Sequence, residues 1–140
     1  MTATAFIDSN IWVYYHAMKP DEKFAVAKAL IDSNFTSLVV STQILGELYH
    51  VLVRKKMASQ ANAGQIILDL VSEFIVVSIE TSQVAKAIEI NNRYGYSYWD
   101  SLIVATALQS NCNILYSEDM QNSQLIEDRL RIINPFILES

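Results

Sequence analysis

Short apolar runs alternate with longer amphipathic stretches along the whole chain. The short runs are rich in β-branched residues and predict strands at residues 3–7, 38–41, 75–79, 114–116 and 131–133. The longer stretches have helical periodicity and predict helices at residues 11–18, 24–33, 43–56, 60–73, 82–94 and 98–111, with a further short helix after Met120. Residues 19–22 are predicted to form the loop between the first two helices, because Pro20 cannot continue the first.

The alternation of strands and helices predicts the fold class. It is typical of βα units packed around a parallel sheet. Each predicted strand is too apolar for an exposed sheet edge, so helices are expected to cover both faces. We therefore expect an α/β fold, a three-layer α/β/α sandwich around a parallel sheet of about five strands. The chain has 140 residues with only three glycines and two prolines, and residues 1–140 are expected to form a single domain.

The charge narrows the classes of function. Ten basic residues stand against fifteen acidic ones, which gives a formal net charge of -5. This balance argues against a protein that coats nucleic acid through a broad basic surface. A nuclease of this charge would need metal ions to neutralise its own carboxylates and the substrate phosphate, with a local basic patch to position the strand.

Cysteine content and hydropathy indicate the compartment. The single cysteine, Cys112, excludes an intramolecular disulfide, and no Cys/His spacing suggests a zinc site. No apolar run approaches the roughly 18 residues of a membrane span, and a signal peptide is not evident. We expect a cytoplasmic protein without membrane association. The mean hydropathy of +0.20 is high for a small monomer and indicates that another chain covers some apolar surface.

Acidic residues gather where the predicted strands end. Ligands of parallel α/β sheets bind outside the carboxyl ends of the strands. The first strand is followed by Asp-Ser-Asn at residues 8–10, and the fourth by Ser-Glu-Asp at residues 117–119. Glu47 lies in the helix after the second strand, and Asp100 lies in the first turn of the last long helix. These segments are the candidates for a functional site.

Each acid also has a purely structural explanation. Asp8 could cap the helix that follows it. Glu47 lies at the border of an apolar helical stripe and could be an ordinary surface carboxylate. Asp100 fits a capping box with Ser97. Asp119 could merely belong to a short helix after the fourth strand.

Several observations favour a shared site over these separate explanations. Three capping-type residues follow the first strand where one would suffice. Glu47 has Val51 at the i+4 position, so no basic residue pairs with it there. Asp100 lies on the inner face of an apolar helix, where a carboxylate is costly without compensation. Converging carboxylates raise one another's pKa values and require a cation, and oxygen ligands favour Mg²⁺ or Mn²⁺ over zinc.

Four spaced motifs, FIDSNIWVYY, STQILGELYHVL, YWDSLIVATAL and ILYSEDM, resemble those of PIN-domain ribonucleases, especially the VapC-type toxins. The resemblance spans nearly the whole chain. It implies that four acids hold one or two Mg²⁺ or Mn²⁺ ions, namely Asp8, Glu47, Asp100 and Asp119. It also implies two supporting polar residues, Asn10 and Ser117. Many family members have Thr at the position of Ser117, and the neighbouring Glu118 leaves open which carboxylate of residues 118 and 119 faces the ions.

The function implied by this resemblance is a Mg²⁺- or Mn²⁺-dependent endoribonuclease that hydrolyses RNA phosphodiester bonds. It further implies the toxin of a type II toxin-antitoxin pair, with a small antitoxin protein as partner, and we expect a homodimer. Two alternatives remain at this stage. One is a non-catalytic PIN-like module that binds RNA or protein, and the other is a receiver-type Mg²⁺-binding signalling domain, which the third strand's ending in residues 79–81 fits poorly.

The histidines and the basic run complete the candidates. A metal-free mechanism with paired histidines would need both His16 and His50 at the site, and His50 is interpreted as a helix-surface residue. Arg54, Lys55 and Lys56 close the helix of Glu47, where positive charge stabilises a helix C-terminus. Positioning of RNA phosphates is the alternative role for these three residues.

Overall fold

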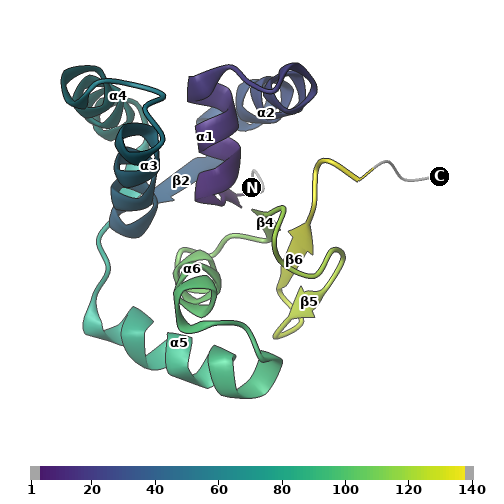
Figure 1. The fold of residues 1–140 in the computed structure, drawn as a ribbon. Coiled ribbons are helices and arrows are strands. Elements are labelled where there is room, and N and C mark those ends of the chain that lie inside the picture. Colours follow the sequence, from purple (N-terminus) through teal and green to yellow (C-terminus); the bar gives the residue numbers. More distant parts are fainter. Residues whose placement is uncertain (1–3, 138–140) are drawn as a thin grey trace.

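The computed structural model describes residues 4–137. In chain order the elements are β1 (Ala5–Ile7), α1 (Ser9–Ala17), α2 (Asp21–Asn34), η1 (Phe35–Ser37), β2 (Leu38–Ser41), α3 (Thr42–Arg54), α4 (Gln60–Glu73), β3 (Ile75–Val77), α5 (Thr81–Tyr94), α6 (Tyr98–Gln109), β4 (Ile114–Tyr116), β5 (Leu125–Ile126) and β6 (Leu130–Ile133) (Figure 1).

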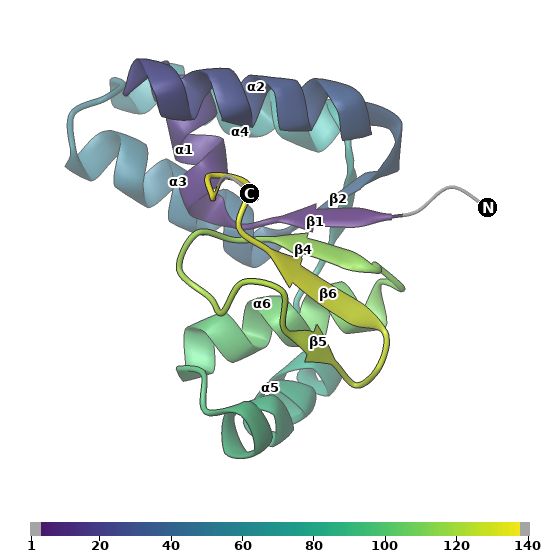
Figure 2. The ribbon, with the colours of Figure 1, turned by 90° about the vertical axis from the view of Figure 1, so that its right-hand side faces the viewer.

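The strands form one sheet in the order β3-β2-β1-β4-β6-β5. All neighbouring strands pair in parallel except β5, which is antiparallel to β6. Helices α1 to α4 lie on one face of the sheet, and α5 and α6 lie on the other (Figure 2). The predicted three-layer α/β/α sandwich is confirmed, with a mostly parallel sheet of six strands.

Strand β5, which the sequence pattern did not predict, lies where a helix was expected. The sequence pattern predicts a short helix after Met120, but this segment forms turns and then β5. Ser123, Glu127 and Asp128 have positive φ angles of 69°, 49° and 57°, which a right-handed helix does not allow. The helix prediction is therefore wrong, and the sheet predicted to have about five strands has six.

Other differences concern boundaries and one edge of the sheet. Helix α2 begins at Asp21, directly after Pro20, so the loop predicted over residues 19–22 is shorter than expected. Residue 3, where the prediction began the first strand, lies outside the described residues. The expectation that every strand is covered is wrong for β3, which is an edge strand with Ile75 69% exposed.

The sheet brings the first and fourth strands together at its centre. The chain passes from β1 to β2 and β3 through helices on one face, and then returns through α5 and α6 on the other face to place β4 beside β1. The register aligns Ile7 with Tyr116, and the backbone N–H of Asp8 donates to the Tyr116 carbonyl at 2.9 Å. Residues 8 and 117 therefore leave the sheet side by side at the point where ligands bind in such folds.

Candidate active site

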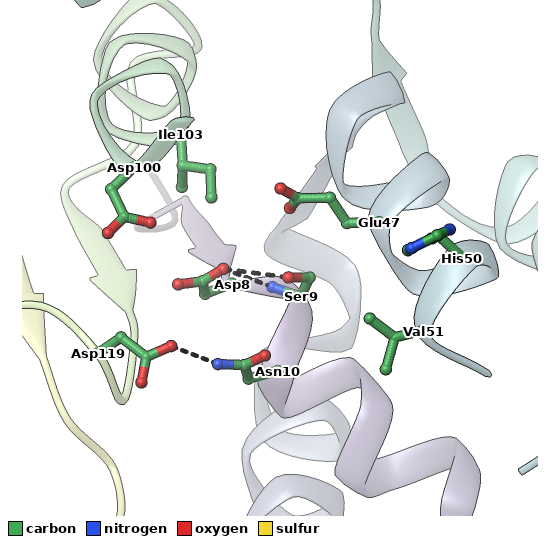
Figure 3. A pocket seen from close by; sticks show the side chains of 9 residues that line it. All are labelled: Asp8, Ser9, Asn10, Glu47, His50, Val51, Asp100, Ile103 and Asp119. Carbon is green, nitrogen blue, oxygen red and sulfur yellow. Dashed lines mark hydrogen bonds between the residues drawn. The ribbon is translucent and has the colours of Figure 1, made fainter. Parts of the chain in front are cut away.

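A pocket of about 340 Å³ opens at the carboxyl ends of β1 and β4 (Figure 3). All four acids of the predicted quartet line it, and they come from four separate segments of the chain. The full lining consists of Asp8, Ser9, Asn10, Glu47, His50, Val51, Asp100, Ile103 and Asp119. The structure thus brings the four acids together in one pocket.

Asp8 lies at the junction of β1 and α1. It is the N-cap of α1, and its Oδ1 accepts a hydrogen bond from the backbone N–H of Ser9 at 2.7 Å. Its Oδ2 accepts from the hydroxyl of Ser117 at 2.8 Å. Asp8 is 4% exposed and Ser117 is fully buried. The capping role and the pocket position coexist, because the carboxylate at a helix N-terminus can cap with one oxygen and retain a second for other partners.

Glu47 enters the pocket from α3 on the opposite side. Its helix begins with Ser41 as N-cap, and the buried side chains of Ile44 and Leu48 fix the rotation of α3 against the sheet. Gln43 donates to Glu47 Oε2 at 3.4 Å, whereas Glu47 Oε1 is buried and has no hydrogen-bond partner within residues 4–137. The interpretation of Glu47 as a surface carboxylate is therefore wrong.

Asp100 comes from the first turn of α6. The hydroxyl of the N-cap Ser97 accepts from the Asp100 backbone N–H at 3.2 Å, which is half of the predicted capping box. The helix is buried from Ser101 to Leu108, so its orientation is fixed on all sides. Asp100 and Ile103 both face the pocket from this helix (Figure 3).

The two acids after β4 point in different directions. Asp119 lines the acidic pocket and accepts a hydrogen bond from the Asn10 side-chain amide. Glu118 is held outside it by Lys23 of α2 and by the hydroxyl of Tyr14 of α1. The structure therefore places Asp119, not Glu118, beside the other three acids.

Burial changes the acidity of the pocket. It raises the pKa of Asp8 from 3.8 to about 6, and the hydrogen bonds from Ser117 and Ser9 counteract part of this rise. Burial is also the largest cause of the raised pKa values of Glu47 and Asp100. Mutual repulsion adds to these shifts in the direction that the sequence predicts, but it is the smaller cause. Burial of these acids in one place therefore makes the folded protein less stable.

The donor set of the pocket fits a hard divalent cation. It is dominated by four carboxylates, joined by the Ser9 hydroxyl, the Asn10 amide and one imidazole, that of His50, and it contains no thiolate. The unpartnered Glu47 Oε1 is an oxygen for which a cation would compensate. As the side chains stand, no group of three or more His, Cys, Asp or Glu residues among those described is close enough to ligate a metal ion. A cation would have to draw these side chains together.

Two further residues line the pocket without having been assigned a specific role from the sequence. Ser9 was one of the three capping-type residues after the first strand, and it lines the pocket beside Asp8. His50 is exposed, as expected for a helix-surface residue, but it also lines the pocket one turn after Glu47. His16 lines a different, aromatic cavity, where burial lowers its pKa to about 4. A mechanism with paired histidines at the acidic pocket is therefore excluded by position.

The basic run is divided by the structure. Arg54 and Lys55 line a second cavity, which adjoins the acidic pocket. Lys56 is exposed and does not line either cavity. Lys55 is also the C-cap of α3, so the favourable interaction with the helix C-terminus remains valid for this residue.

None of the helices within residues 4–137 combines the length and the hydropathy that a membrane-spanning helix requires. This finding agrees with the apolar runs of the sequence, which are all short.

Comparison with solved structures reveals related folds. The sarcin-ricin loop cleaving toxin VapC20 of Mycobacterium tuberculosis is 21% identical, with a TM-score of 0.68 over 80% of this chain and 87% of that chain. A toxin-antitoxin complex from Klebsiella pneumoniae is 15% identical, with a TM-score of 0.73 over 96% of this chain and 100% of that chain. A DNA-bound VapBC complex from Salmonella typhimurium is 16% identical, with a TM-score of 0.66 over 94% and 97% of the two chains.

Comparison of sequences identifies the family. No curated protein sequence matches the chain. The PIN domain family matches it over residues 5–125, which include every acid of the pocket. The resemblance carried by the four motifs is confirmed at this level. The chain belongs to the PIN domain family.

Proposed function

We propose that this PIN-domain protein is a metal-dependent endoribonuclease that hydrolyses RNA phosphodiester bonds. The observation that carries the proposal is the convergence of four carboxylates, from segments as far apart as residues 8 and 119, on one pocket at the carboxyl edge of the sheet. A fold that only needed stability would not bury acids there, because their desolvation is unfavourable.

Asp8, Glu47, Asp100 and Asp119 would hold one or two Mg²⁺ or Mn²⁺ ions. When bound, such an ion lowers the pKa of a water nucleophile and neutralises charge that develops on the phosphate. The chain's own residues orient this site. Ser117 holds Asp8 through its hydroxyl, and Asn10 holds Asp119 through its amide.

Glu47 and Asp100 face each other across the pocket, from α3 and α6 (Figure 3). Burial raises the pKa of both side chains, and a bound cation would act in the opposite direction by stabilising their carboxylate forms. His50, at the rim, is placed to approach an RNA strand that enters the pocket.

We further propose that the protein acts as the toxin of a type II toxin-antitoxin pair, forms a homodimer and is neutralised by a small antitoxin protein in the cytoplasm. The related folds include toxin-antitoxin complexes, two of which are described as bound to DNA together with their partners. Exposed apolar side chains on α5 and α6, namely Val84, Ile88 and Trp99, offer a surface for a second copy of the chain.

The test is cleavage of RNA by purified protein with Mg²⁺ or Mn²⁺ and with EDTA. We expect cleavage only with metal, and loss of cleavage in Asp8→Asn and Asp100→Asn. Asp128→Asn is the matched control, because Asp128 is exposed, lies outside the pocket and has a positive φ of 57° that Asn tolerates. Circular dichroism shows whether each variant is folded.

Cleavage by EDTA-treated protein, or by both pocket variants, would refute the catalytic assignment. Binding of RNA without any cleavage would favour the non-catalytic PIN-like module. The receiver-type alternative loses its support, because the chain belongs to the PIN domain family.

A further inference from the structure

A second cavity, of about 590 Å³, adjoins the acidic pocket. The two share Asn10, Val51 and Asp119 as lining residues, so one opens beside the other. This second cavity lies between α1, the C-terminal end of α3 and the segment after β4. A polymer held over the four acids can therefore continue directly into it.

Three cations from two separate segments line this cavity. Arg54 and Lys55 come from the end of α3, and Lys19 comes from the connection between α1 and α2. All three are exposed, and none forms a salt bridge within residues 4–137. The cavity thus presents unpaired positive charge in a protein whose net charge is -5.

The acids that border the cavity do not neutralise these cations. Glu118 is occupied by Lys23 and Tyr14, and Asp119 by the amide of Asn10. The stabilisation of the α3 C-terminus explains Arg54 and Lys55 but not Lys19, which does not belong to that helix.

We propose that this cavity is a phosphate-binding subsite for the RNA nucleotides next to the bond that is cut. The inference rests on the proposed ribonuclease function and adds the path of the substrate. Lys19, Arg54 and Lys55 hold phosphates, which fixes the register of the strand without reading its sequence. The apolar side chains of Val13, Pro20 and Met57 in the same cavity supply a surface for sugar and base.

The test uses the variants Lys19→Gln, Arg54→Gln and Lys55→Gln, singly and combined. Lys56→Gln is the matched control, because Lys56 follows Lys55 and carries the same charge but lies outside the cavity. Binding of a fluorescent single-stranded RNA of mixed sequence is measured by anisotropy over a range of salt concentrations. The measurement is made in an Asp100→Asn background, which is expected not to cut the probe.

Each cavity variant should make the negative slope of log association constant against log salt concentration shallower by about 0.7, and the triple variant by about 2. Lys56→Gln should leave the slope unchanged. In the otherwise wild-type protein the triple variant should raise KM for RNA cleavage and leave kcat nearly unchanged, because the cations hold phosphates that are not attacked.

A wild-type slope in the triple variant would overturn the proposal and would leave the cations free for an acidic protein partner. An equal effect of Lys56→Gln and Lys55→Gln would also overturn it, because binding would then follow net charge. Failure of the proposed function has a different result, in which the slopes change as expected but the wild-type protein does not cut RNA with any metal.

Discussion

Each end of helix α1 holds a titratable side chain on which the helix dipole and burial act in opposite directions. Asp8 caps the N-terminus and His16 lies in the last turn, so the helix dipole favours the charged form of both. Burial nevertheless prevails at each end. It raises the pKa of Asp8 to about 6 and lowers the pKa of His16 to about 4. At both ends desolvation, which favours the neutral form, is the largest cause of the shift.

The partners at the two ends differ. Asp8 accepts hydrogen bonds from Ser9 and Ser117, and other acids surround it. His16 stacks on Trp12, with ring centroids 6.1 Å apart, and its Nε2 has no partner within residues 4–137. One end is therefore arranged for a cation, and the other for a neutral ring in an aromatic cavity. Without bound metal, in EDTA, both side chains should make the stability of the protein depend on pH.

The largest expected effect is that of His16 on stability at low pH. Its folded pKa of about 4 lies below the ordinary 6.5, so the unfolded chain binds the proton more tightly. Stability should therefore fall by about 3 kcal/mol as the pH decreases from about 7 to about 4. His16→Phe keeps the stacked ring and should remove this dependence. Urea unfolding at both pH values measures it, and an unchanged pH dependence in His16→Phe would contradict the prediction.

Asp8 should act in the opposite direction and slightly less strongly. Its folded pKa of about 6 exceeds the ordinary 3.8, so the folded protein binds the proton more tightly, and stability falls as the pH rises from about 4 to about 7. The expected loss is about 2 kcal/mol. Asp8→Asn should remove it and should make the protein more stable than wild type at neutral pH. The same urea experiment tests this, and equal stability changes at both pH values would rule it out.

A variant of Ser117 shows whether the hydrogen bond to Asp8 contributes to the affinity of the pocket for a cation. Ser117→Ala removes the hydroxyl that holds Asp8 Oδ2, and the affinity for Mn²⁺ should fall by about 10- to 100-fold. Isothermal titration with Mn²⁺ measures the affinity. Thr106→Val is the control, because it removes another buried hydroxyl, which donates to the Leu102 carbonyl within α6. Equal losses in the two variants would mean that Ser117 has no special role.

The smallest effect on stability is expected for Lys23, which pairs with Glu118 outside the acidic pocket. Glu118 has a cationic partner, unlike Asp8, and the pair is partly exposed. Lys23→Met should therefore lower the free energy of unfolding by only about 0.5 kcal/mol. The rate of RNA cleavage should fall clearly although stability changes little, because Glu118, once free of Lys23, competes with Asp119 for the pocket. Thermal unfolding and cleavage rates of one preparation measure both, and the double variant Lys23→Met/Glu118→Gln should recover the cleavage rate.

Local sequence patterns predicted most of the fold. The strong periodicity of α3, the continuous apolar run of α6 and the short apolar runs of β1, β2 and β4 reflect burial, which the sequence pattern records directly. Strand β5 was missed because it has two residues, and its place depends on pairing with β6 rather than on its own periodicity.

In the candidate site, too, the features set by local sequence were predictable, and those set by contacts between distant segments were not. Asp8 and Asp119 were predicted because they follow strands at the carboxyl edge of the sheet, Asp100 because it lies in the first turn of a helix, and Glu47 because it lies in the helix after β2. The choice between Glu118 and Asp119 was not predictable, because Lys23 decides it from 95 residues away. Lys19 and His50 reach their cavities through the packing of α1 and α3, which no local pattern reveals.

The neighbouring positions of β1 and β4 have a consequence for biosynthesis. Asp8 is translated before Ser117 and Asp119, which complete its surroundings and come 109 and 111 positions later. A nascent or truncated chain that lacks β4 therefore has only part of the acidic cluster. Under the proposed function, a cell that makes this nuclease is exposed to its activity only after the segment that follows β4 has been translated, which leaves time for a neutralising partner to be made alongside it.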